Sequence, residues 1–146
     1  MKSLSVKLGV ILIGFAIFAH AEVWGEDWVF VYRGGTTDEF ICYMDKASIT
    51  RLPSGDVRVR AKLVQTTEKG VIEMERALEL EGKNIRYGHM IGLYEVKCTK
   101  RMYNAQSLKA YSKEGTVIRE LFEQPSVDVP IESDSFMGKL HKLLCN

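Results

Sequence analysis

The sequence predicts an α+β fold: one antiparallel sheet of about six strands, a short mid-chain helix and a C-terminal helix. Two observations support this prediction. Between residues 27 and 123, most segments are short, rich in β-branched and aromatic residues, and separated by turn residues. After them, apolar residues recur at helical spacing in the last segment of the chain. Strands followed by a terminal helix are typical of α+β domains.

The first two strands are predicted to form a hairpin. Residues 27–33 and residues 39–44 have the residue types of strands, and Gly-Gly-Thr-Thr at residues 34–37 separates them. Because side chains alternate along a strand, the aromatic residues of the first strand are expected on one face. These residues are Trp28, Phe30 and Tyr32.

The third predicted strand has the clearest alternation in the chain. A Leu-Pro-Ser-Gly-Asp turn at residues 52–56 precedes it. Residues 57–63 then alternate apolar side chains with Arg58, Arg60 and Lys62. Such a strand buries one face and exposes the other to water.

Residues 71–85 fit two patterns. Several apolar residues recur with period two, as in a strand, but Val71, Met74 and Leu78 also share a helix face. The high content of Glu, Met, Ala and Leu favours a helix. We therefore predict a short helix that is stopped by Gly-Lys-Asn at residues 82–84.

Three further strands are predicted over residues 91–99, 101–111 and 116–123, and a hairpin turn at residues 112–115 joins the last two.

The final helix is expected to follow a cap formed by Ser133 or Asp134 and to end near Cys145. Its apolar residues at helical spacing are Phe136, Met137, Leu140, Leu143 and Leu144.

The N-terminus predicts export. Lys2 and Lys7 precede an uncharged apolar run, residues 8–18, and an Ala-His-Ala cleavage site ends at Ala21. We expect residues 1–21 to be a cleaved Sec signal peptide, because the run is shorter than the ~20 apolar residues that span a bilayer. No stable membrane anchor is then expected after cleavage.

The remaining chain, residues 22–146, has the size of one domain. The sequence contains 20 Lys and Arg against 19 Asp and Glu, and both lysines of the signal peptide are lost on cleavage. A nearly neutral chain without a basic block is not attracted to nucleic acid, so no nucleic-acid partner is expected.

The residue pattern contains no catalytic or metal site. Beyond the signal peptide the histidines are His89 and His141, and neither has a neighbour at metal-ligand spacing. A Gly-x-Ser-x-Gly setting for a nucleophile and a Cys-x-x-Cys pair are both missing. We therefore expect no enzyme activity, no metal and no cofactor.

Three cysteines enter an oxidising compartment if the chain is exported. Cys42, Cys98 and Cys145 allow one disulfide and one remaining thiol, in any of three pairings.

Several short motifs follow one another along the chain: Asp-Trp at residues 27–28, Asp-Lys-Ala-Ser-Ile at 45–49, Leu-Tyr-Glu-Val-Lys-Cys at 93–98 and Pro-Ile-Glu-Ser-Asp-Ser at 130–135. Their order resembles that of the surface-adhesin protein E family of small secreted bacterial proteins. The resemblance covers nearly all of the chain beyond the signal peptide.

The resemblance implies a six-stranded antiparallel sheet with the C-terminal helix on its concave face. It also implies a Cys98–Cys145 disulfide, which would stabilise the fold by about 4 kcal/mol in the chain-entropy model. Cys42 is then a free thiol. This thiol is either buried and unreactive or paired with another chain, and the second reading is compatible with a homodimer.

The resemblance further implies a non-enzymatic, adhesin-like domain in the periplasm or on the outer surface of a Gram-negative cell. The partner would be a protein or a glycan. A basic surface formed by Arg58, Arg60, Lys62, Lys97 and Arg101 would suit an acidic partner, although an ordinary solvated sheet face uses the same residue types. The alternative function is a periplasmic carrier or sensor that holds a small ligand between sheet and helix.

Overall fold

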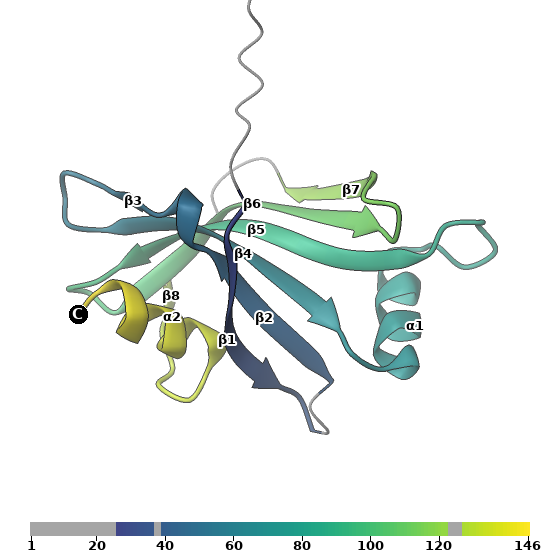
Figure 1. The fold of residues 1–146 in the computed structure, drawn as a ribbon, viewed down its shortest axis with the longest axis horizontal. Helices are drawn as coiled ribbons and strands as arrows, with labels where there is room; N and C mark the ends of the chain where they lie inside the picture. Colours follow the sequence, from purple (N-terminus) through teal and green to yellow (C-terminus); the bar gives the residue numbers. More distant parts are fainter. Residues whose placement is uncertain (1–25, 37–38, 123–126) are drawn as a thin grey trace, which may run out of the picture.

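The computed structural model describes residues 26–36, 39–122 and 127–146, so the predicted signal peptide lies outside the described residues. Within these ranges, eight strands form one antiparallel sheet and two α-helices pack against it (Figure 1). The predicted α+β class and the single antiparallel sheet are confirmed. In the described part of the chain, neither helix is long and apolar enough to cross a bilayer.

Six strands form the main path of the sheet, in the order β1-β2-β4-β5-β6-β7. They are β1 (Trp28–Gly34), β2 (Phe40–Asp45), β4 (Val57–Gln65), β5 (Tyr87–Lys97), β6 (Met102–Ser112) and β7 (Val117–Phe122). Two very short strands pair beside this path, β3 (Thr50–Arg51) with β4 and β8 (Val129–Pro130) with β6. The helical elements are the 3-10 turn η1 (Lys46–Ser48), α1 (Glu68–Ala77) and α2 (Phe136–Leu144).

Both α-helices cover the same face of the sheet, near its two ends (Figure 1). α2 packs against Ala61 of β4, whereas α1 packs in a second cluster that includes Ala110 of β6. The register places Leu63 opposite Met90 and Met90 opposite Ala110. Directly opposed residues point to one face, and residues two apart on a strand do so as well. Ala61 and Ala110 therefore lie on the same side.

The main core lies between α2 and the middle strands. Leu140 is completely buried and Leu144 is nearly so, and they meet the apolar side of the alternation in β4. The buried members of this core are Met44, Val57, Val59, Ala61, Val96, Ile131, Met137, Leu140 and Leu144. The predicted packing of the C-terminal helix on the sheet is confirmed.

The start of α2 differs from the predicted cap. Ser135 is the N-cap, and its Oγ accepts a hydrogen bond from the Gly138 backbone N–H at 3.0 Å. The predicted caps, Ser133 and Asp134, lie in the turn just before it. A Cβ on Gly138 would lie 2.4 Å from the carbonyl oxygens of Glu132 and Ser133, so the tight approach of this turn requires glycine.

The predicted helix over residues 71–85 is correct in kind but wrong in its bounds. α1 begins at Glu68 because the side chain of Thr67 accepts a hydrogen bond from the backbone of Gly70. It ends at Ala77 because Glu79 takes a left-handed conformation, with φ of 57°. The chain then turns inward and buries Leu80, so the helix ends before the predicted glycine stop.

Two strand predictions also need correction. The strand predicted to start at residue 91 begins at Tyr87, which is completely buried in the cluster beneath α1. In β1, an irregularity between Phe30 and Tyr32 shifts the register, so Tyr32 does not share a face with Trp28 and Phe30. The Tyr32 hydroxyl instead donates to the carbonyl oxygen of Asp134, just before α2.

A disulfide joins Cys98, at the end of β5, to Cys145, at the end of α2. The two Cα atoms lie 5.4 Å apart, and the bridge spans a sequence separation of 47 residues. His141 Nε2 donates to the carbonyl oxygen of Cys98 at 2.9 Å, and Arg51 Nη1 donates to that of Leu144 at 3.1 Å. The last turn of α2 is therefore held from two sides, and the implied Cys98–Cys145 pairing is confirmed.

We predict that removing this disulfide lowers the melting temperature by about 10–20 °C, the shift expected for a loss of about 4 kcal/mol. The measurement is thermal unfolding with and without dithiothreitol. A Cys98→Ala/Cys145→Ala variant serves as the control, because its melting temperature should be low already and insensitive to the reductant. Peptide mapping that finds Cys42 bridged to either partner would contradict the pairing.

Cys42 is a completely buried free thiol, and its burial raises its pKa to about 12. Almost no thiolate is present near pH 8, and the thiolate is the reactive form. We predict that the native protein does not react with Ellman's reagent at pH 8, while the unfolded protein reacts at one thiol per chain. Rapid reaction of the native protein, or a dimer that dissociates on reduction, would show that Cys42 is accessible.

Candidate functional site

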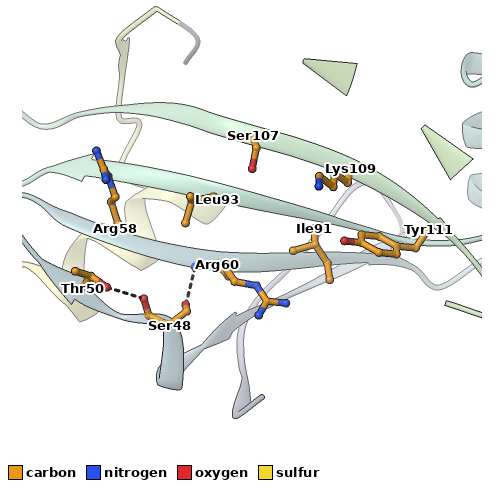
Figure 2. Close-up of a pocket in the computed structure, with 9 residues that line it drawn as sticks. All are labelled: Ser48, Thr50, Arg58, Arg60, Ile91, Leu93, Ser107, Lys109 and Tyr111. Carbon is orange, nitrogen blue, oxygen red and sulfur yellow. Dashed lines mark hydrogen bonds between the residues drawn. The ribbon is translucent and has the colours of Figure 1, made fainter. Parts of the chain in front are cut away.

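The candidate site lies on the sheet face opposite α1 and α2, which we call the bare face. A groove of about 550 Å³ crosses this face over β4, β5 and β6 (Figure 2). We call it the basic groove, and its lining residues are Ser48, Thr50, Arg58, Arg60, Ile91, Leu93, Ser107, Lys109 and Tyr111. Three cations and several hydroxyl groups therefore share one open hollow.

The pairing of the strands explains why these residues meet. Arg60 lies opposite Leu93, and Leu93 lies opposite Ser107, so one row crosses β4, β5 and β6. Tyr94 follows Leu93 and so points to the helix-covered side, where its ring forms a T-shaped contact with that of Phe136.

Arg58 and Arg60 have carboxylate partners of different kinds. Arg58 Nε lies 2.9 Å from Glu95 Oε2, and 43% of the Arg58 side chain is exposed. Arg60 is more enclosed, and its Nη1 lies 3.4 Å from Oδ2 of the completely buried Asp45. Arg58 is thus the more exposed arginine, with a largely buried partner in Glu95, whereas the Arg60 pair reaches into the fold.

Asp45 organises the corner where β2 passes into η1. Its Oδ1 accepts hydrogen bonds from the backbone N–H groups of Asp27 and Ala47, at 2.9 and 3.1 Å. Its Oδ2 has no hydrogen-bond donor among the described residues, so Arg60 supplies its compensating charge. Arg60 is therefore part of the fold as well as of the groove.

Lys62 lies beside the basic groove, on the same face of β4 as Arg58 and Arg60. Its Nζ lies 4.4 Å from the centroid of the Trp28 ring and 5.6 Å from that of Tyr43. Arg60 also lies over Trp28, at 5.4 Å. These distances fall within the range of cation–π contacts.

The far end of the groove contains Lys109, Tyr111 and their neighbours. Lys109 Nζ lies 2.7 Å from Glu120 Oε1 of β7. The rings of Tyr111 and His89 stack at 5.0 Å with an interplanar angle of 7°. Burial first, and then the positive charge of Lys62, lower the pKa of His89, so this imidazole is neutral at pH 7.

The other two predicted binding residues lie apart from the basic groove. Lys97 Nζ lies 2.8 Å from Asp128 Oδ2, and this hydrogen bond raises the pKa of Lys97. Hydrogen bonds from Asn104 and Lys97 lower the pKa of Asp128. Arg101 is exposed in a turn with φ of 51° and lines a separate hollow beside α2. Of the five predicted residues, the structure thus brings together Arg58, Arg60 and Lys62.

Sequence reasoning missed Ser48, Ser107, Lys109 and Tyr111. The last three lie on β6, which matches the strand predicted over residues 101–111, and alternation places them on one face. Their position beside Arg60 depends on the pairing of β4 with β5 and of β5 with β6, which places Arg60 opposite Leu93 and Leu93 opposite Ser107. No residue pattern predicts this register. Ser48 lies in η1, which was not predicted.

A further hollow, of about 360 Å³, lies on the helix-covered face beside the first turn of α2 and is distinct from the one lined by Arg101. We call it the apolar hollow. Its wall is mostly apolar and includes Phe40, Leu63, Tyr103 and Phe136, with the buried Cys42 also among the lining residues. It is the apolar space that the carrier alternative requires. In the described ranges, no three His, Cys, Asp or Glu side chains gather closely enough to hold a metal ion.

Comparison with known proteins gives one match. The family model described as surface-adhesin protein E matches residues 28–146 of the chain, from the first strand to the last residue. No curated protein and no solved structure matches the chain. The family match spans most of the chain and agrees with the resemblance seen in its motifs. The chain therefore belongs to the surface-adhesin protein E family.

Proposed function

We propose that this protein is an exported, non-enzymatic binding domain that attaches to an acidic protein or glycan through the basic groove. The observation that carries the proposal is the position of three cations, Arg58, Arg60 and Lys109, in one hollow on a face that neither described helix covers. Membership of a surface-adhesin family supports an adhesin role.

The exposed cations of the groove suit binding to an anionic partner. Arg58 and Lys109 are 43% and 39% exposed. Lys109 meets the exposed Glu120, whereas Glu95, the partner of Arg58, is only 14% exposed. The exposed Lys109–Glu120 pair contributes only about 0–1 kcal/mol, so an incoming carboxylate or sulfate replaces Glu120 at small cost. Arg58 keeps its bond to Glu95 and offers the exposed part of its guanidinium. Such contacts mainly raise the association rate and are weakened by salt.

Export is part of the proposal. The Cys98–Cys145 disulfide is of the kind that persists in oxidising compartments, such as the periplasm and the cell exterior. The predicted signal sequence would direct the chain there.

We predict that an Arg58→Gln/Lys109→Gln variant binds immobilised cell-envelope extract about tenfold more weakly than the unmodified protein, because two exposed cations of the groove are lost. Surface plasmon resonance at two salt concentrations measures the change. Arg60 is left intact because its loss would leave the buried charge of Asp45 uncompensated.

The matched control is Lys69→Gln/Arg76→Gln, which removes the same charge from exposed positions of α1. This control should keep the binding of the unmodified protein. Equal binding by the groove variant and the unmodified protein would show that the basic groove is not the attachment surface.

Carriage of a small apolar ligand is the second candidate function, and it is favoured by the apolar hollow of about 360 Å³ beside the first turn of α2. A ligand held there stabilises the folded state and raises the melting temperature. Under this alternative we predict that saturating laurate raises the melting temperature of the unmodified protein but not that of Leu63→Trp, which fills the hollow. The Arg58→Gln/Lys109→Gln variant should keep the rise, and an unchanged melting temperature in the unmodified protein argues against carriage.

A further inference from the structure

One row of directly opposed residues crosses the whole bare face, perpendicular to the strands. Each member lies opposite the next in the strand register, so all point to the same side of the sheet. From β1 to β7 the row consists of Phe30, Tyr43, Lys62, Ile91, Lys109 and Glu120. It begins with an aromatic ring, has two cations further along and ends with an acid.

The charge of Lys62 differs from that of the other cations on this face. Arg58, Arg60 and Lys109 each meet a carboxylate, whereas the Lys62 ammonium lies over the rings of Trp28 and Tyr43. Among the described residues, Lys62 forms no ion pair. Because an aromatic ring has no net charge, it orients the ammonium without neutralising it. Lys62 therefore offers a full positive charge to an incoming anion.

Phe30 places an open aromatic surface next to this charge. Phe30 is 59% exposed, the most of any aromatic residue on the described part of the sheet, and its ring forms a T-shaped contact with Tyr43 at a centroid distance of 6.5 Å. A T-shaped contact leaves at least one face of the Phe30 ring available. The apolar C–H face of a sugar ring is a good partner for such an exposed aromatic face.

The distance between Lys62 and Lys109 indicates the spacing of anionic groups in the partner. Lys62 and Lys109 lie two strands apart, so their backbones are separated by about 10 Å. This is roughly the disaccharide repeat of an extended polysaccharide that has one anionic group on every second ring. In an extended acidic peptide, side chains on one face recur every second residue, at only about 7 Å. The row fits the polysaccharide better than the peptide.

Resting on the proposed function of the bare face, we propose that its partner is an extended anionic polysaccharide laid across the strands. One sugar ring stacks on Phe30, and successive anionic groups, carboxylate or sulfate, bind Lys62 and Lys109. The anion at Lys109 replaces the carboxylate of Glu120.

The test is isothermal titration calorimetry of the intact protein with three polyanions. Hyaluronan hexasaccharide has a carboxylate on every second ring, a heparin hexasaccharide adds sulfate, and poly-glutamate has the charge without sugar rings. We expect at least one of the two glycans to bind more tightly than poly-glutamate of equal charge. The glycan that binds identifies the anionic group.

The variants separate the two contacts. Lys62→Met keeps the stem over Trp28 but removes the charge, and Phe30→Ser removes the stacking surface. Each should weaken glycan binding about tenfold, which is the effect of about 1.4 kcal/mol. The matched controls on α1, Lys69→Met and Ile72→Ser, should leave binding within twofold. Lys62→Gln is the second charge variant, in case Lys62→Met alters folding, and the circular dichroism spectrum of each variant checks this.

The outcomes distinguish this inference from the proposed function. If poly-glutamate binds most tightly, and Phe30→Ser has no effect, the partner is an acidic polypeptide. The polysaccharide is then ruled out, while attachment through the basic groove stands. If no polyanion binds and Arg58→Gln/Lys109→Gln retains its binding to envelope extract, both the polysaccharide and the groove are ruled out.

Discussion

The burial of α2 against the middle of the sheet is the contact on which the architecture depends. A helix as short as Phe136–Leu144 is marginal in water, so its stability comes from packing rather than from propensity. Leu140 and Leu144 provide that packing, and the disulfide at Cys145 keeps the end of the helix from fraying. Without α2, the apolar side chains of β4 would be exposed to water.

Because both helices cover one face of the sheet, the other face is left free of helices in the described part of the chain. The cations of β4 point away from α2 because Val57, Val59 and Ala61 point toward it. The same alternation that builds the core therefore presents Arg58, Arg60 and Lys62 on the bare face. Fold and candidate surface are consequences of one residue pattern.

Much of this organisation could be predicted from the sequence, because strong period-two alternation and helical spacing report directly on burial. β4 and α2 are the best examples. The details that depend on contacts between distant residues could not be predicted. The irregularities after Phe30 and Leu93 change which side chains share a face, and the left-handed Glu79 ends α1 early. The ion pair between Arg60 and Asp45 likewise joins two strands that only the folded register brings together.

That pair has an evolutionary consequence. Arg60 cannot be exchanged freely, since Asp45 holds a buried negative charge that would lose its counterion. Selection for a different partner would therefore act on the outlying positions, such as Arg58 and Lys109, while Arg60 stays constant. Related chains should diverge in ligand preference at the margins of this surface around an invariant arginine and aspartate.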